Sequence, residues 1–158
     1  VQRHVQAFLL SQFLAGQTDN STKLVSKWFF HPERNPSSRC DDFLSWLLTI
    51  AETLGDVETG INRLIARSVL QTTSCRKLLD DAHRAMWEIS STWIAERDAI
   101  LRELAVMGEV PEDEKKLLPE QKAVKHQLKR HEEEYLLREL AASGYLPSHG
   151  FPLYVLPL

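Results

Sequence analysis

One helical pattern, over residues 74–107, constrains the fold of this chain more than any other feature. Leu79, Met86, Trp93, Ile100 and Met107 recur every seven residues, and neither proline nor glycine interrupts the stretch. An apolar repeat of this period is typical of a helix that packs along a continuous seam. At about 1.5 Å per residue, the pattern predicts a helix roughly 50 Å long.

A second long helix is predicted over residues 119–142. Pro119 suits the first helical position, and Gly144 suits the end of a helix. The residues expected to face inward are Val124, Leu128, Tyr135, Leu136 and Leu140. Because only a short loop joins the two long helices, they must lie antiparallel. Residues 73–144 are therefore predicted to form a long antiparallel hairpin.

The preceding part of the chain, residues 1–72, predicts a small bundle of shorter helices. Apolar residues at three- and four-residue steps indicate a helix that ends at Gly16. A second helix is expected to begin after Ser38 and to end at Gly55, and Asp56 is the expected cap of a third. Leu24, Val25, Trp28 and Phe29 fit one face of a helix, but the density of aromatic residues here also suits a strand. We therefore expect an all-α protein, in which residues 145–158 form a turn and a short extended tail leading to a further domain.

The composition excludes several broad classes of protein. Of 158 residues, 43% are apolar and 26% charged, an ordinary balance for a globular domain. A net charge of -3 does not indicate a protein covered by nucleic acid, but it is compatible with a local basic patch. Cys40 and Cys75 lie in no CxxC spacing, which favours reduced thiols. No apolar run has the length of a membrane span and no signal peptide is evident, so we expect a cytoplasmic location without membrane contact.

No catalytic motif or cofactor site is evident in the sequence. Gly55 and Gly60 have the spacing of a phosphate-binding loop, but Ile61 and Asn62 follow where lysine and serine or threonine are required. The histidines form no zinc-binding pair, and His131 is expected to be half-buried on the inner face of its helix. We expect no catalytic residue, metal or cofactor in these residues.

One stretch of the chain is strongly basic. Between positions 115 and 130, a single acid, Glu120, accompanies Lys115, Lys116, Lys122, Lys125, Lys129 and Arg130. Positive charge near the start of a helix opposes the helix dipole, so helix stability does not explain these residues. Contact with the phosphates of DNA or RNA would explain them. The alternative is ion pairing across the hairpin with Glu96, with Glu103 and with the acidic turn at 112–114, an arrangement in which Lys122 lies close to Glu103.

The end of the chain carries a resemblance to a known family. The stretch LLRELAASGYLPSHGFP resembles a segment of large bacterial helicases of the DEAD/DEAH type, which serve in DNA repair and phage defence. The opening RHVQAFLLSQFL is similar to the helix that follows their second ATPase lobe. The junction that leads into their C-terminal domain corresponds here to Gly144, Leu146, Pro147, Gly150, Phe151 and Pro152.

The resemblance implies a non-catalytic helical region that connects a helicase motor to a further domain. The ATPase lobes, which would bind ATP and Mg²⁺, would lie upstream of Val1, and a domain with a cysteine cluster would lie downstream. This chain itself contains no DEAD/DEAH box. The basic side of the predicted helix 119–142 would then guide a strand of DNA or RNA. The alternative is a coiled-coil-type interaction module that docks a partner protein or associates weakly with itself along the Trp93 seam.

Overall fold

The computed structural model describes residues 1–16, 24–32, 37–53, 55–68 and 70–148. The regular elements in these residues are α-helices and one short 3₁₀ helix. The only β-type pairing among them is an isolated antiparallel bridge between Val25 and Tyr135. The fold is therefore all-α, as predicted. No described helix combines the length and the apolar character that crossing a membrane requires.

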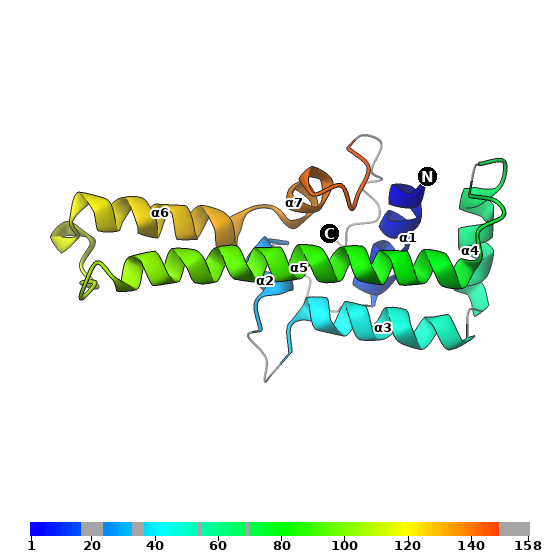
Figure 1. Ribbon diagram of the computed structural model, residues 1–158, viewed down its shortest axis with the longest axis horizontal. Coiled ribbons are helices and arrows are strands. Elements are labelled where there is room, and N and C mark those ends of the chain that lie inside the picture. The colour runs from blue at the N-terminus through cyan, green and yellow to red at the C-terminus, as the bar shows by residue number, and fades with distance from the viewer. Residues whose placement is uncertain (17–23, 33–36, 54, 69, 149–158) are drawn as a thin grey trace.

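The long helix α5 (Cys75–Ala105) extends along the molecule and organises the other elements (Figure 1). Around its N-terminal half lie α1 (Gln2–Ala15), α3 (Arg39–Thr53) and α4 (Gly55–Ile65). These helices, together with α2 (Ser26–Phe30), α7 (Leu136–Ala142) and residues 75–92 of α5, are called the body. One apolar cluster runs through the whole body, and it contains residues from both sides of positions 72 and 73.

Beyond the body, α6 (Pro119–Glu133) lies alongside the C-terminal half of α5 and runs in the opposite direction (Figure 1). Residues 93–133, which contain this pair of helix segments and their connection, are called the arm. Within the body, the short helices α2 and α7 lie nearest to the arm (Figure 1). The arm is therefore a two-helix extension of a multi-helix body.

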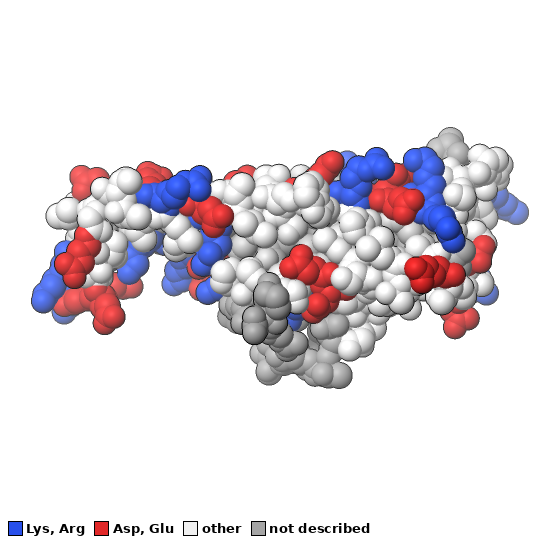
Figure 2. All heavy atoms as spheres, turned by 60° about the horizontal axis from the view of Figure 1, so that its bottom comes forward, with Lys and Arg blue, Asp and Glu red and all other residues white. Residues whose placement is uncertain are grey.

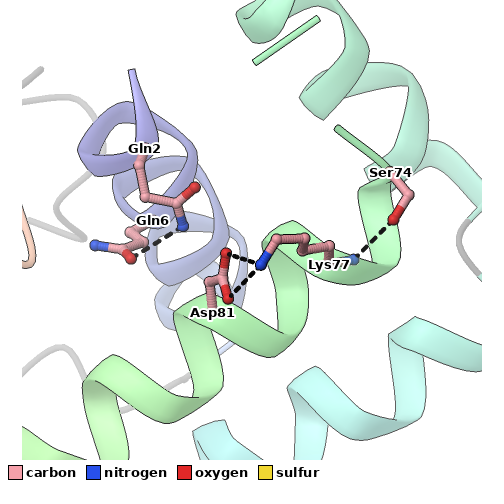
Figure 3. A network of polar contacts seen from close by, with 5 residues as sticks. All are labelled: Gln2, Gln6, Ser74, Lys77 and Asp81. Carbon is pink, nitrogen blue, oxygen red and sulfur yellow. Dashed lines mark hydrogen bonds and ion pairs between the residues drawn. The ribbon is translucent and has the colours of Figure 1, made fainter. Parts of the chain in front are cut away.

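Two predicted helix starts are confirmed by their capping hydrogen bonds. Ser74 Oγ accepts a hydrogen bond of 3.1 Å from the N–H of Lys77, at the start of α5 (Figure 3). Ser38 Oγ accepts one of 3.1 Å from the N–H of Asp41, whose carboxylate accepts one of 3.0 Å from the N–H of Ser38. Such bonds satisfy donors that the start of a helix leaves without an intrahelical partner. One turn into α5, Lys77 forms an ion pair with Asp81 at 3.3 Å (Figure 3).

The boundary between α3 and α4 differs from the prediction. Helix α4 already begins at Gly55, so Asp56 lies in its first turn and does not cap it. Further along α4, Gly60 packs directly against the ring of Phe8 from α1, and a Cβ at this position would lie 2.3 Å from that ring. Gly60 therefore allows two helices to approach closely, which accounts for this glycine without a phosphate ligand.

The body has an aromatic core, and the seam of α5 faces it. Phe29, Phe30 and Phe43 are fully buried, and Phe29 and Phe30 pack edge to face with their centroids 5.1 Å apart. Four of the five seam residues are buried as predicted: Leu79, Met86, Trp93 and Ile100. The seven-residue repeat thus identifies the buried side of α5 correctly.

The helix predicted over residues 119–142 is broken at Glu134 and Tyr135. The carbonyl of Glu134 accepts a hydrogen bond of 2.8 Å from the N–H of Ser26, and the N–H of Leu136 donates one of 2.8 Å to the carbonyl of Leu24. The backbone around the break therefore pairs with residues 24–26 instead of continuing its own helix. Glu134 and Tyr135 accordingly have extended ψ angles of 136° and 124°.

Residues 24–29, for which the sequence allowed a helix or a strand, contain both an extended residue and a helix. Val25 is extended and forms the bridge to Tyr135, and α2 begins at the next residue. Trp28 of α2 is buried, with the guanidinium of Arg39 4.4 Å from its ring centroid. A single extended residue followed by one helical turn explains why the sequence pattern was ambiguous here.

The end of α7 follows the predicted helix stop. Gly144 has a φ of +83°, which favours glycine, and the N–H of Tyr145 donates to the carbonyl of Leu140 at 2.9 Å. Tyr145 is buried in the body, where its hydroxyl donates to the carbonyl of Ala82 at 3.1 Å and its own carbonyl accepts from Gln6 at 2.7 Å. Leu146 and Pro147 of the predicted junction are also buried. The other members of the junction, Gly150, Phe151 and Pro152, lie outside the described residues. Of the predicted turn and tail, residues 145–148 are described and pack against the body; they are called the docked segment.

Candidate nucleic-acid interface

A row of lysines lies along α6. Lys122, Lys125 and Lys129 follow one another at three- and four-residue spacing, so they share one face of the helix. Lys122 and Lys129 are exposed and Lys125 is half-buried. These three and Lys115 line one open hollow. The hollow is completed by Glu114, Leu117, His126, Leu128 and Glu132.

Local hydrogen bonds hold the connection before α6 in place beside the row. Asp113 Oδ1 accepts a hydrogen bond of 3.0 Å from the N–H of Lys115, at the start of the 3₁₀ helix η1 (Glu114–Lys116). The buried Gln121 side chain accepts a hydrogen bond of 2.9 Å from the backbone at the start of α6 and donates one of 3.2 Å to the carbonyl of Glu109. Lys115 is therefore held next to the α6 lysines, although it comes from a different element.

Ion pairs among the described residues do not neutralise the lysines. Within the part of the chain that the structure describes, none of the six cations at 115–130 lies within 4.0 Å of a carboxylate oxygen. The expected pairing of Lys122 with Glu103 is therefore wrong. Glu103 instead lines a separate hollow with Gln127 and Arg130. Because successive residues of a helix are rotated by about 100°, Gln127 and Lys122 lie on different sides of α6.

One of the two acids in the lysine hollow is compensated by cations from other elements. Glu132 Oε2 lies 2.7 Å from Arg97 Nε and 4.0 Å from Lys27 Nζ. The Arg97 and Glu132 side chains are both largely buried, which strengthens a charge-assisted hydrogen bond of this length. Glu114 is then the remaining acid beside four lysines, so the hollow has a net positive charge.

A second hollow continues the first toward the α6–α7 break. His126 and Lys129 line both hollows. The other residues of the second hollow are Arg130, Glu133, Glu134, Tyr135 and Arg138. Tyr135, which was expected to face inward, is 40% exposed. The cause is the bridge to Val25, which takes the backbone out of the helix at this residue.

The six predicted cations are thus only partly brought together. Lys115, Lys122, Lys125 and Lys129 share one hollow, and Arg130 lies in the second, whereas Lys116 is exposed but lines neither. On the face of the molecule in Figure 2, blue and red spheres are interspersed at the arm end, and much of the centre is uncharged. The cationic character is therefore a local property of the two hollows and not of the whole arm.

His131 is structural, as predicted. Its side chain is 15% exposed, its ring stacks on Trp93 with centroids 4.7 Å apart, and Nε2 lies 3.0 Å from the Trp93 carbonyl oxygen. Because a carbonyl can only accept, Nε2 is the donor in this hydrogen bond. On its other side Trp93 stacks on Phe30 with centroids 5.4 Å apart. These three rings join α2, α5 and α6 at the root of the arm.

The same stack bears on the expected self-association along the Trp93 seam. Trp93 is only 2% exposed, because Phe30 and His131 occupy its surroundings. A second copy could reach the seam here only by displacing these rings. In contrast, Trp87, on another side of α5, is 55% exposed.

Near the root of the arm, one carboxyl group has a shifted pKa. Burial raises the pKa of Glu139, and the charge of Glu96 adds to this effect. His131 lowers this pKa and Glu134 raises it. Glu139 therefore holds its proton more strongly in the folded protein than in the unfolded chain.

Burial raises the pKa of both cysteine thiols. Burial raises the pKa of the Cys40 thiol to about 12, although a hydrogen bond with Ser90 lowers it. At neutral pH this thiol is not ionised, and only the thiolate is nucleophilic. The described residues also contain no group of three or more histidine, cysteine, aspartate or glutamate side chains placed to hold a metal ion.

A scan against protein-family models finds no match to this chain, and searches of curated proteins and of solved structures find none either. Only the geometry and charge of the described residues therefore bear on its function.

Proposed function

We propose that this chain is a non-catalytic helical module that binds the phosphate backbone of DNA or RNA through the lysines of the arm. One observation carries the proposal: Lys115, Lys122, Lys125 and Lys129 line one hollow, and none of them has an ion-pair partner among the described residues. Four cations with no carboxylate within ion-pairing distance repel one another. A bound polyanion removes this repulsion and releases its own counterions.

The wider role that we propose is that of a connecting module in an ATP-dependent helicase-like protein. Support comes from the position of the docked segment at 145–148, which lies in the body and not in the arm. Gln6, near the start of the described chain, donates to the carbonyl of Tyr145 at 2.7 Å, so the two ends of the described chain lie close together. The ATPase motor and the C-terminal domain of such a protein would thus both connect to the body. The arm would then be free to contact a strand of DNA or RNA.

Charge neutralisation tests the proposed contact with phosphate. In the variant Lys122→Gln/Lys125→Gln/Lys129→Gln, we expect most of the affinity for DNA and RNA oligonucleotides at low salt to be lost, irrespective of base sequence. The measurement is fluorescence anisotropy with labelled oligonucleotides. A matched control, Arg63→Gln/Arg67→Gln/Arg84→Gln, removes the same charge from exposed positions on the body and should bind like the unmodified chain.

Two results would contradict the proposal. In the first, the unmodified chain binds neither DNA nor RNA at low salt, which would show that the lysine hollow does not bind nucleic acid. Alternatively, the control variant could lose as much affinity as the lysine variant, which would show that binding depends on total charge and not on the arm.

A further inference from the structure

We infer that Tyr135 is a stacking platform for an unpaired base, so that the arm prefers single-stranded nucleic acid to a duplex. The inference rests on the proposed function and adds to it the class of ligand and a residue that contacts a base. It starts from the exposure of the ring. Tyr135 is 40% exposed and lines a hollow together with Lys129, Arg130 and Arg138.

The lysine row leads directly to this ring. His126 and Lys129 line both the hollow of the lysines and the hollow of Tyr135, so the two are continuous. From Lys122 to Lys129 the helix rises by about 10 Å, at 1.5 Å per residue. If the phosphates of a strand lie along these lysines, the following bases of that strand therefore lie next to Tyr135. Sites that bind single strands combine these same two parts, a cationic groove and an aromatic ring.

The charge around Tyr135 also favours a polyanion. Of the two acids in its hollow, Glu134 is paired with Arg138 at 3.5 Å. Glu133 is the other. It lines the hollow together with Lys129 and Arg130, neither of which has an ion-pair partner among the described residues. The approach to the ring therefore remains cationic.

The backbone of Tyr135 is held in place from both sides. Ser26 donates to the carbonyl of Glu134 through its N–H at 2.8 Å and through its hydroxyl at 3.0 Å, and the N–H of Leu136 donates to the carbonyl of Leu24 at 2.8 Å. A ring on a fixed backbone loses little conformational freedom when a base stacks on it. In a duplex the faces of the bases are covered by their neighbours, so only an unstacked base can use such a ring.

The test compares side chains with and without an aromatic ring at position 135. The variants are Tyr135→Leu, Tyr135→Ala and Tyr135→Phe, with Trp87→Ala as a control at an exposed aromatic residue outside both hollows. The probes are oligothymidylate and oligouridylate of about 20 nucleotides, an abasic strand of the same length and a duplex. Binding is measured by fluorescence anisotropy, and circular dichroism verifies that each variant is folded.

We expect Tyr135→Leu and Tyr135→Ala to weaken binding of both base-containing strands about fivefold or more. Binding of the abasic strand and of the duplex should not change. Tyr135→Phe and Trp87→Ala should bind all probes like the unmodified chain.

The failures of the two proposals can be told apart. If no probe binds at low salt, the proposed function and this inference both fall. If the strands bind in a way that depends on the α6 lysines, but Tyr135→Leu and Tyr135→Ala bind them like the unmodified chain, the inference alone is overturned. Equal weakening for the abasic strand would also overturn it, because that strand has no base to stack.

Discussion

The body and the arm share the helix α5 but bury it in different ways. In the body, helices on several sides cover the α5 seam, and residues such as Leu79 and Met86 belong to one continuous apolar cluster. At the root of the arm Phe30 of α2 still stacks on Trp93. Beyond this point α6 is the described helix that packs along α5, and the buried apolar residues Ile100, Leu117 and Val124 lie outside that cluster. The arm thus has a thinner core.

Polar and aromatic contacts make up for part of this thinner core. The ion pair between Arg97 and Glu132 and the stack of Trp93 on His131 connect α5 to α6. Gln121 fixes the connection between them. Only Gln121 and Val124 of α6 are buried, so its lysines are not needed for packing against α5. We therefore expect stability to reside mainly in the body, and we propose that binding resides in the arm.

The largest effect is expected from a cavity in the body. Phe29→Ala removes a fully buried ring that packs against Phe30, and it should lower the free energy of unfolding by about 3–5 kcal/mol. Urea unfolding followed by circular dichroism measures this loss. The control is Val106→Ala at a position 84% exposed, for which the change should stay within about 0.5 kcal/mol. A loss below about 1 kcal/mol for Phe29→Ala would mean that the aromatic core is not central to stability.

A smaller and more local effect is expected in the arm. Ile100→Ala should cost about 2–3 kcal/mol, because the thinner core can partly close around the cavity. Amide hydrogen exchange should accelerate in α6 more than in α3, whereas Ile94→Ala, at an exposed position of the same helix, should leave both unchanged. Equal acceleration in α3 and α6 would contradict the separation of arm and body.

The smallest effect concerns the pH dependence at the boundary between the two regions. Because burial and Glu96 raise the pKa of Glu139, the folded state binds this proton more strongly than the unfolded state. The contribution of Glu139 to stability therefore falls as pH rises from its ordinary pKa of 4.5 through the raised value. Glu139→Gln should raise the thermal midpoint slightly at about pH 7 and leave it unchanged at about pH 4. The same shift at both pH values would show that ionisation is not its cause.

Much of the fold could be predicted because its signals are local. The seven-residue repeat identified the buried side of α5, and Ser38 and Ser74 were correctly identified as caps. Gly144 was correctly expected to end a helix, since its positive φ suits glycine. Such features depend on residues within a turn or two of each other, which the sequence shows directly.

The break at Glu134 and Tyr135 could not be predicted, because its cause is far away in the sequence. The backbone there pairs with residues 24–26, and nothing in the local pattern indicates such a partner. This one error also placed Tyr135 inward and concealed it as a candidate for binding. The pairing of Lys122 with Glu103 failed for a similar reason, because it required the rotation of α6 relative to α5.

The most direct test of the division between body and arm measures binding and stability in the same variant. For Lys122→Gln/Lys125→Gln/Lys129→Gln, the logarithm of the oligothymidylate binding constant is measured against the logarithm of salt concentration, together with the thermal unfolding midpoint. We expect the salt dependence to become less steep by about two, because each phosphate contact with a single strand contributes about 0.7. The unfolding midpoint should not fall, because the substitutions remove charge repulsion and no buried contact. A salt dependence as steep as that of the unmodified chain would show that these lysines do not contact phosphate, and it would contradict the assignment of binding to the arm.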